Sequence, residues 1–280
     1  MYARMVHSVL TNAPVWVVYV LFALVPAALA VAAHDRFRRI VPGEVLIPHH
    51  EVAGFLVSVV GLLFAVVLAF LVAAAWANFD AAQRNADAEA SDVAEAFATS
   101  QILPQPTRGR VRSLLADYAF EVRDREWPLL AKGEQDPQAR RLMLRSFSEV
   151  ALMPVMPNAT ISAALQRSSL QTIVLSSLHD LSEKRRSRLL DAGRHIEGAL
   201  YLALVLAWVI LLAFVFLFGC ARVLQLSMTA LITAMIGLLF AVIVEFDLPY
   251  GHGIRVSTAA WTFVIENNRL ADYRTATPAR

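Results

Sequence analysis

The ionisable residues with the clearest chemical potential stand where the last apolar run of the sequence ends. Glu245 lies inside the end of that run, and Asp247 follows two residues later. Burial of a carboxylate in a membrane span is costly, so a functional role is the first hypothesis. A carboxylate at the membrane–water interface, paired with Arg255, is an equally weighted alternative. The candidate motif as a whole contains Glu245, Asp247, Pro249, Tyr250, Gly251 and Arg255.

A second group of chemically capable residues lies between the first two apolar runs. Its members are His34, Asp35, His49, His50 and Glu51. Adjacent histidines point in different directions on regular backbone, and no two histidines of the sequence stand three or four residues apart. That is the spacing that would place two ligands on one helical face. We therefore interpret the group as an interfacial loop and predict no metal site.

Enzymatic motifs are absent from the sequence. It contains no glycine-rich phosphate loop, zinc motif or nucleophile elbow, and Gly251-His252-Gly253 is interpreted as a tight turn. The net charge of +2 is too small to indicate a nucleic-acid partner, and the single cysteine, Cys220, cannot form an intramolecular disulfide. We predict a protein that is not an enzyme and has no cofactor.

The composition indicates a membrane protein. Hydrophobic residues make up 58% of the chain and charged residues 17%, a balance expected when long apolar spans accompany one polar domain. Four runs are long enough to cross a bilayer. They cover about residues 14–33, 52–77, 197–219 and 226–246. A cleaved signal peptide is the alternative for the first run, but its length and the following Arg36, Arg38 and Arg39 favour a span.

The second run is the element around which the rest is organised. Gly54–Trp76 is almost wholly apolar, and no Pro or Gly interrupts the helical pattern from there to Leu103. Alternating steps of four and three residues place mostly small side chains on one stripe, which predicts close helix packing in the membrane and in a bundle beyond it. The stripe contains Gly54, Ser58, Gly61, Ala65, Leu68, Val72, Ala75, Phe79, Ala82, Ala86, Glu89, Val93 and Ala96.

One internal similarity links the second and fourth runs. Residues 61–70 read GLLFAVVLAF and residues 237–246 read GLLFAVIVEF, with identity at seven of ten positions. A duplicated two-span unit and coincidence within a restricted apolar alphabet both explain it.

Residues between the second and third runs have helical periodicity. We predict a helix capped by Thr107 and closed by Trp127-Pro128, a second with Asp136 as N-cap and Pro137 at its first position, and a third that leads directly into the third run. The predicted division is 1–77 (membrane hairpin), 78–196 (soluble helical domain), 197–250 (membrane hairpin) and 251–280 (C-terminal tail). The predicted fold class is an all-α membrane protein with four transmembrane helices, a helical cytoplasmic bundle inserted between spans 2 and 3, and long helices that continue from the membrane into the cytoplasm.

Basic residues near the span ends predict the orientation. Eight of them stand on the side of the soluble domain, against four in the two short loops. The positive-inside rule therefore places the N-terminus, the soluble domain and the C-terminus in the cytoplasm, with the spans in the inner (cytoplasmic) membrane. The opposite orientation rests on the Arg36–Arg39 cluster.

Three segments carry a resemblance to a known family. They are the run from Ala73-Ala74-Ala75-Trp76 to Leu103-Pro104, the basic Arg185–Leu189 segment, and above all the acidic span end followed by Leu248-Pro249-Tyr250-Gly251. Over residues 50–260 the sequence resembles the bestrophin-like domain family. The resemblance implies a four-span fold related to bestrophins, which are homo-oligomeric, usually pentameric, anion channels lined by the second span. The sequence lacks an acidic calcium clasp and an aromatic triplet on that span.

Two functions follow as hypotheses. The first is a homo-oligomeric channel for small anions, lined by Ser58, Gly61, Ala65, Leu68 and Val72, with Lys184–Arg188 attracting anions to its mouth. In the second, a non-transporting scaffold or signalling protein, the long helices carry a change in the soluble domain into the bilayer. For the stripe and the basic cluster, close packing and the positive-inside rule are the simpler explanations.

Overall fold

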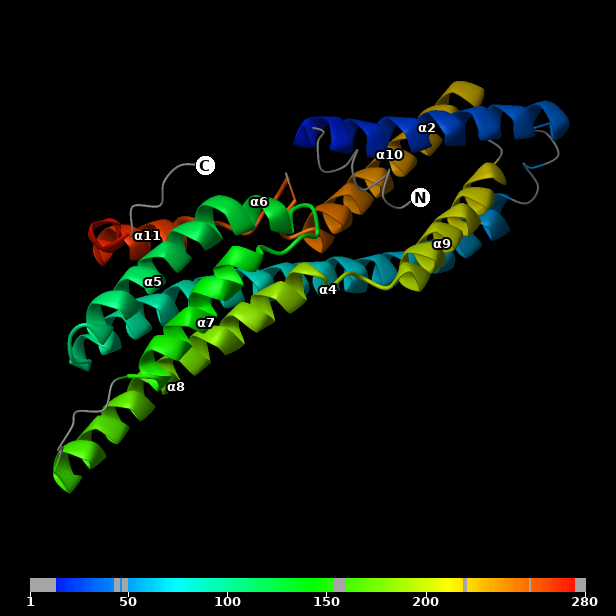
Figure 1. The fold of residues 1–280 in the computed structure, drawn as a ribbon. Helices are drawn as coiled ribbons and strands as arrows, with labels where there is room; N and C mark the ends of the chain where they lie inside the picture. The colour runs from blue at the N-terminus through cyan, green and yellow to red at the C-terminus, as the bar shows by residue number, and fades with distance from the viewer. Residues whose placement is uncertain are drawn as a thin grey trace. The chain divides into compact units, whose positions relative to one another are not determined.

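The computed structural model describes residues 14–42, 46, 50–153, 160–218, 221–251 and 253–274. These residues form helices and turns, and no β-strand occurs among them (Figure 1). The predicted all-α fold class is confirmed. The interpretations given above for His49, Cys220 and His252 fall outside the described residues.

The chain divides into two compact units. Unit 1 comprises residues 1–79 and 195–255, and unit 2 comprises residues 80–194 and 256–280. One helix, α4 (His50–Thr99), supplies residues to both units. Residues 251–280 are predicted above as a separate tail, whereas the described residues 256–274 group with unit 2.

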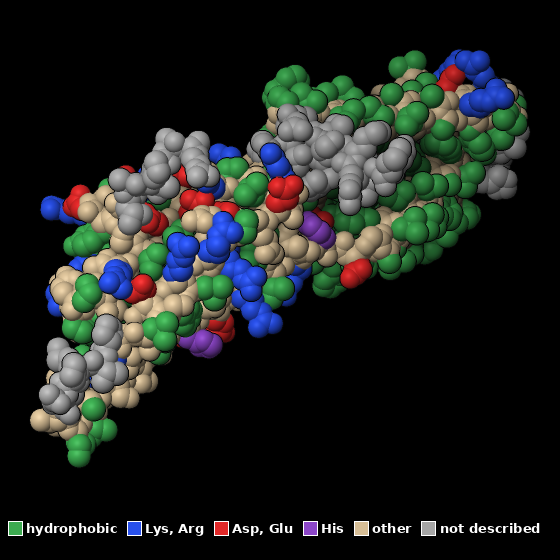
Figure 2. All heavy atoms as spheres, viewed as in Figure 1, with side chains coloured by type: hydrophobic (Ala, Val, Ile, Leu, Met, Phe, Trp, Pro, Cys, Tyr) green, Lys and Arg blue, Asp and Glu red, His purple; other side chains and the backbone are tan. Residues whose placement is uncertain are grey.

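Unit 1 contains the helices that are long and apolar enough to cross a membrane. They are α2 (Val15–Ile40), the first part of α4, α9 (Gly198–Phe216) and α10 (Arg222–Asp247). They coincide with the four predicted spans. Hydrophobic side chains cover most of their visible surface, whereas charged side chains gather over unit 2 (Figure 2).

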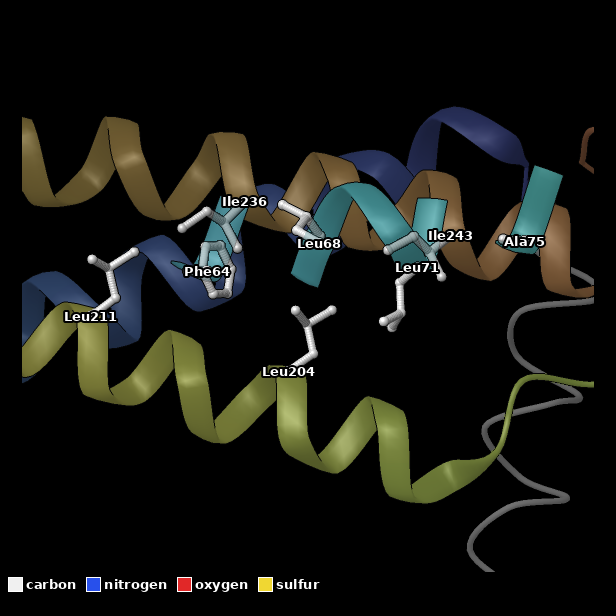
Figure 3. Close-up of a cluster of buried hydrophobic side chains, with 8 residues drawn as sticks. All are labelled: Phe64, Leu68, Leu71, Ala75, Leu204, Leu211, Ile236 and Ile243. Atoms are coloured by element: carbon white, nitrogen blue, oxygen red, sulfur yellow. The ribbon is translucent and has the colours of Figure 1, made fainter. Parts of the chain in front are cut away.

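Close packing inside unit 1 has two components. The backbones of α2 and α10 approach so closely at Gly237 that an added Cβ would overlap the carbonyl group of Phe22. Side chains from α4, α9 and α10 form a separate apolar core (Figure 3). The buried members of this core are Phe64, Leu68, Leu71, Ala75, Leu204, Leu211, Ile236 and Ile243.

Unit 2 is a bundle formed by the second part of α4 and several shorter helices. These are η2 (Ser100–Ile102), α5 (Thr107–Glu121), the π-helical turn η3 (Val122–Glu126), α6 (Trp127–Leu130), α7 (Pro137–Ala151), α8 (Ile161–Ala192), α11 (Ala259–Asn267) and η4 (Leu270–Tyr273). The predicted start of α7 is confirmed, because Asp136 accepts a hydrogen bond from the Gln138 N–H at 2.9 Å and Pro137 opens the helix.

Three boundary predictions are wrong. Thr107 is a buried first residue of α5 and makes no capping hydrogen bond. Trp127-Pro128 does not end the helical path, because proline at the start of α6 needs no N–H partner there. The soluble helix does not lead directly into the third span, since α8 ends at Ala192 and α9 begins at Gly198. The intervening Gly193 has low helix propensity.

Candidate functional site

The stripe predicted on α4 divides into two parts. From Leu68 onward its members are buried or half-buried; Leu68 is 6% exposed and belongs to the core of Figure 3. Nearer the start of the span, Ser58 and Ala65 are exposed, while Gly61 is half-buried beside Leu211. The chain's own helices therefore cover Leu68, whereas the side of α4 that bears Ser58 and Ala65 is uncovered.

Glu245 binds the backbone that follows α10. Its Oε2 accepts a hydrogen bond from the Ile254 N–H at 2.8 Å, and the carboxylate lies so close to Gly253 that a Cβ there would overlap it. Arg255 is exposed, and the described residues include no ion pair between it and Glu245. The carboxylate of Glu245 thus binds a turn of main chain, and not the arginine that the sequence suggested.

Asp247 performs a similar role for the segment before α9. Its Oδ1 accepts a hydrogen bond from the Ile196 N–H at 2.7 Å, and the ring Nδ1 of His195 lies 3.0 Å from its backbone oxygen. Pro249 and Tyr250 are buried next to it, and the Gly251 N–H closes a turn on Leu248 O at 2.9 Å. The motif brings the two ends of the C-terminal hairpin, residues 195–196 and 247–254, together.

This arrangement predicts a graded response at Asp247. In Asp247→Ala the Ile196 N–H loses its acceptor, and we expect the free energy of unfolding to fall by about 1 kcal/mol. Asp247→Asn keeps an acceptor oxygen and is expected to lose less. Thermal unfolding of both purified variants measures the difference. Equal losses in the two variants would show that the charge of Asp247 matters more than its hydrogen bond.

Unit 2 contains a buried ionic network that is not predictable from the spacing of its residues in the sequence. It consists of Glu89 on α4, Tyr118 on α5, Glu126 at the end of η3, and Arg185 and Arg188 on α8. All five are less than 5% exposed. The spacing of three residues puts both arginines on one face of α8, and the π-helical turn ends at Glu126, opposite them.

Every member of the network is bonded to another. Arg185 binds Glu126 with both terminal nitrogens, at 2.5 and 2.8 Å, and Arg188 Nη2 donates to the same carboxylate at 2.6 Å. Arg188 also pairs with Glu89, which accepts from the Tyr118 hydroxyl at 2.5 Å. Two carboxylates and two guanidinium groups balance in charge. Bidentate geometry of this kind is what allows such charges to be buried.

The network shifts the pKa values of its members. Burial by itself would raise the pKa of Glu126, but the attraction of Arg188 and the hydrogen bond from Arg185 outweigh burial and hold it below its ordinary value. Burial and the neighbouring Glu89 carboxylate raise the pKa of Tyr118 well above the usual value for a phenol. The carboxylate is therefore ionised and the tyrosine protonated at neutral pH.

The lowered pKa of Glu126 predicts a stability change in acid. Because folding depresses this pKa, the stability that Glu126 contributes is complete above about pH 4.3, the ordinary value for glutamate, and is lost as the pH falls through the folded-state value. We expect Glu126→Gln to be less stable than the parent protein at pH 7. Urea unfolding between pH 7 and pH 3 should show this difference narrowing in acid, and a constant difference would contradict the assignment.

The network revises one expectation about the basic cluster. Arg185 and Arg188 were expected to help attract anions, but both are buried and neutralised by Glu126 and Glu89. Only Lys184 and Arg186 of that cluster remain available for such a role. The one signal present in the sequence was Glu89, a charged residue on a stripe of small and apolar side chains.

Comparisons with known proteins decide the family. The model of the bestrophin-like domain matches residues 15–261. The chain belongs to the bestrophin-like family. The crystal structure of a bacterial bestrophin homologue from Klebsiella pneumoniae covers 88% of this bestrophin-like chain and 97% of its own, at 15% identity and a TM-score of 0.58.

Other solved structures agree with this match. A single-residue variant of the Klebsiella pneumoniae homologue covers 90% of this chain and 97% of its own at 16% identity and a TM-score of 0.61. A crystal structure described only as a membrane protein covers 89% and 99% at 16% identity and a TM-score of 0.60. At such identities these likenesses establish the fold. The search of curated proteins finds no match. The bestrophin-like chain is thus a multi-pass membrane protein with the bestrophin fold.

Proposed function

We propose that this bestrophin-like protein is a homo-oligomeric channel for small anions in the inner (cytoplasmic) membrane. The observation that carries the proposal is the uncovered side of α4 around Ser58 and Ala65, within a chain that matches the family over residues 15–261. Copies of this side arranged around an axis would form a pore wall of small side chains. The motif from Glu245 to Arg255 would hold the ends of the C-terminal hairpin at one end of the spans.

The five candidate lining residues of the proposed pore differ in how far they are exposed in the single chain. Ser58 and Ala65 are exposed in the single chain, Gly61 and Val72 are half-buried, and Leu68 is buried. A residue at the pore surface must reach water in the assembled channel. We therefore propose Ser58 and Ala65 as the principal lining positions, with Leu68 supporting the wall from behind.

Cysteine accessibility tests this ordering. In a Cys220→Ser background, which removes the chain's only cysteine, Ala65→Cys and Leu68→Cys are reconstituted separately in liposomes and treated with a negatively charged thiol reagent. We expect the reagent to reduce chloride efflux through Ala65→Cys at least about tenfold, because charge placed in a narrow pore blocks anions. Leu68→Cys, the matched buried control, should be unaffected.

The same preparation tests transport itself. Chloride efflux above that of empty liposomes, absent when gluconate replaces chloride, supports an anion channel. No efflux from protein shown to be folded and oligomeric would overturn the channel proposal and favour a non-transporting scaffold. Block of Leu68→Cys but not Ala65→Cys would keep the channel and reverse the proposed lining.

The proposed orientation puts the N-terminus, unit 2 and the C-terminus in the cytoplasm. Its support is the excess of basic residues at the ends of the spans on that side. Protease added to sealed right-side-out cells should leave Arg140 and Arg141, which are exposed on α7, uncut. Cleavage there without lysis would reverse the orientation.

A further inference from the structure

A histidine in unit 1 lies outside every site described above. His34, near the end of α2, is fully buried. Its ring stacks on Phe216 of α9 with the two centroids 4.2 Å apart, and its Nδ1 lies 2.7 Å from the hydroxyl oxygen of Thr229 on α10. The imidazole is therefore enclosed by three helices.

The hydrogen bonds of Thr229 indicate an assignment for the proton of the His34 ring. The Thr229 hydroxyl donates to the backbone oxygen of Gln225 at 3.0 Å. A hydroxyl has one proton, so towards His34 it can only accept. We therefore assign the ring proton to Nδ1, as the donor to Thr229, which gives the neutral ring a bare lone pair at Nε2.

That lone pair has no partner. Nε2 of His34 is buried and makes no hydrogen bond to any residue that the structure describes. One helical turn along α10 from Thr229, the hydroxyl of Thr233 is also buried without a partner. Buried polar atoms are normally paired, so two unpaired atoms on the α2–α10 contact are unusual. An imidazole nitrogen with a free lone pair is a place where a proton can bind.

The surrounding charges would not balance a second proton. On α2, Asp35 and Arg38 lie near the ring; on α10, Arg222 is the charged group at this end, and α9 presents the aromatic ring of Phe216. Asp35 already pairs with both Arg39 and Arg222, and Arg38 repels a positive charge. A protonated ring would have an N–H without an acceptor in apolar surroundings, which is costly.

We propose that Nε2 of His34 is a proton-binding site within the membrane-spanning unit, and that proton binding weakens the contact between α2 and α10. The site responds to the pH on the side of the membrane at which α2 ends and α10 begins. Unit 1 is tightly packed at neutral pH and loosens reversibly in mild acid. This inference does not depend on whether the protein conducts ions.

Nitrogen NMR of the full chain in lipid nanodiscs tests proton binding directly. Histidine is labelled with ¹⁵N, and the His34 signals are assigned by their absence from His34→Asn. We expect the Nδ1–H tautomer at pH 8 and protonation of Nε2 on titration to pH 5 while the protein stays folded. The Nε2–H tautomer at pH 8, or a ring that stays neutral at pH 5, would overturn the proposal.

Thermal unfolding of the same samples tests the structural consequence. The Tm of the parent protein should fall by about 5 °C between pH 8 and pH 5. His34→Asn offers an amide donor to Thr229 but cannot titrate. Its Tm should therefore fall much less than that of the parent protein between pH 8 and pH 5. Thr233→Val removes the neighbouring unpaired hydroxyl and keeps His34, so its fall should match the parent's.

A further control replaces His195, a histidine that lies next to the carboxylate of Asp247. His195→Asn should keep the acid sensitivity, because His195 lies beside Asp247 at the opposite end of α10 from Thr229. An undiminished fall of Tm in His34→Asn would show that other groups cause the pH dependence, and the proposal would be wrong.

Discussion

Arg188→Met is expected to lower the free energy of unfolding of unit 2 by about 3–5 kcal/mol, since it leaves two buried carboxylates with one guanidinium group. Among the described residues, Glu89 would lose its one ion-pair partner, and Glu126 would keep Arg185 alone. Water cannot reach either carboxylate, because both are fully buried. Urea unfolding of the full chain, followed by the fluorescence of Trp127 and Trp261 in unit 2, measures the loss.

The adjacent surface provides the matched control for this variant. Arg186→Met removes the same charge and side-chain type from an exposed position two residues away, and its effect should be within about 0.5 kcal/mol. Adding Glu89→Leu to Arg188→Met removes the uncompensated charge and should restore part of the stability. A loss below about 1 kcal/mol in Arg188→Met would mean that the network is not closed to water.

Gly237→Ala is expected to destabilise unit 1 by about 3 kcal/mol, because its Cβ would overlap backbone atoms and not a flexible side chain. The atoms in its way belong to Phe22 and Ala23 of α2. Relief requires α2 and α10 to separate along their contact. The higher helix propensity of alanine returns at most about 1 kcal/mol. Thermal unfolding in detergent or nanodiscs measures the change.

The internal sequence similarity supplies the control. Gly61 occupies in residues 61–70 the position that Gly237 occupies in residues 237–246, yet a Cβ at Gly61 would meet only the Leu211 side chain, at 3.8 Å. Gly61→Ala should therefore be neutral or slightly stabilising. Similar losses in both variants would contradict the structural difference. The two glycines occupy equivalent positions in sequence but not in packing.

The elements that were predictable from sequence are those set by local physics. The lengths of the apolar runs predicted all four spans, and an aspartate N-cap followed by proline predicted the start of α7. The predicted packing of the stripe on α4 holds from Leu68 to Ala96, where its side chains are buried or half-buried. A spacing near 3.5 residues keeps one face of a helix against its neighbours. Before Leu68 the buried face moves to Val57, Val60 and Phe64, a change that small residue size alone does not reveal.

The sites depended on partners that periodicity cannot supply. Glu245 suggested an arginine, but the structure gives it a backbone N–H nine residues later. The pairs Glu89–Arg188 and Glu126–Arg185 join residues 99 and 59 positions apart. Arg185 and Arg188 looked like part of a solvated basic cluster, because nothing in a single sequence distinguishes an arginine held by a distant carboxylate from one in water.

The contact between His34 and Thr229 has a consequence for biosynthesis. The two residues are separated by 195 positions, and a ribosome adds roughly 5–20 residues per second. For on the order of 10–40 seconds, therefore, the first span has emerged while the helix that will receive its histidine and Asp35 has not been made. During that interval His34 and Asp35 must be accommodated by lipid headgroups, water or the insertion machinery. The polar end of α2 therefore meets two successive environments, of which the folded protein is the second.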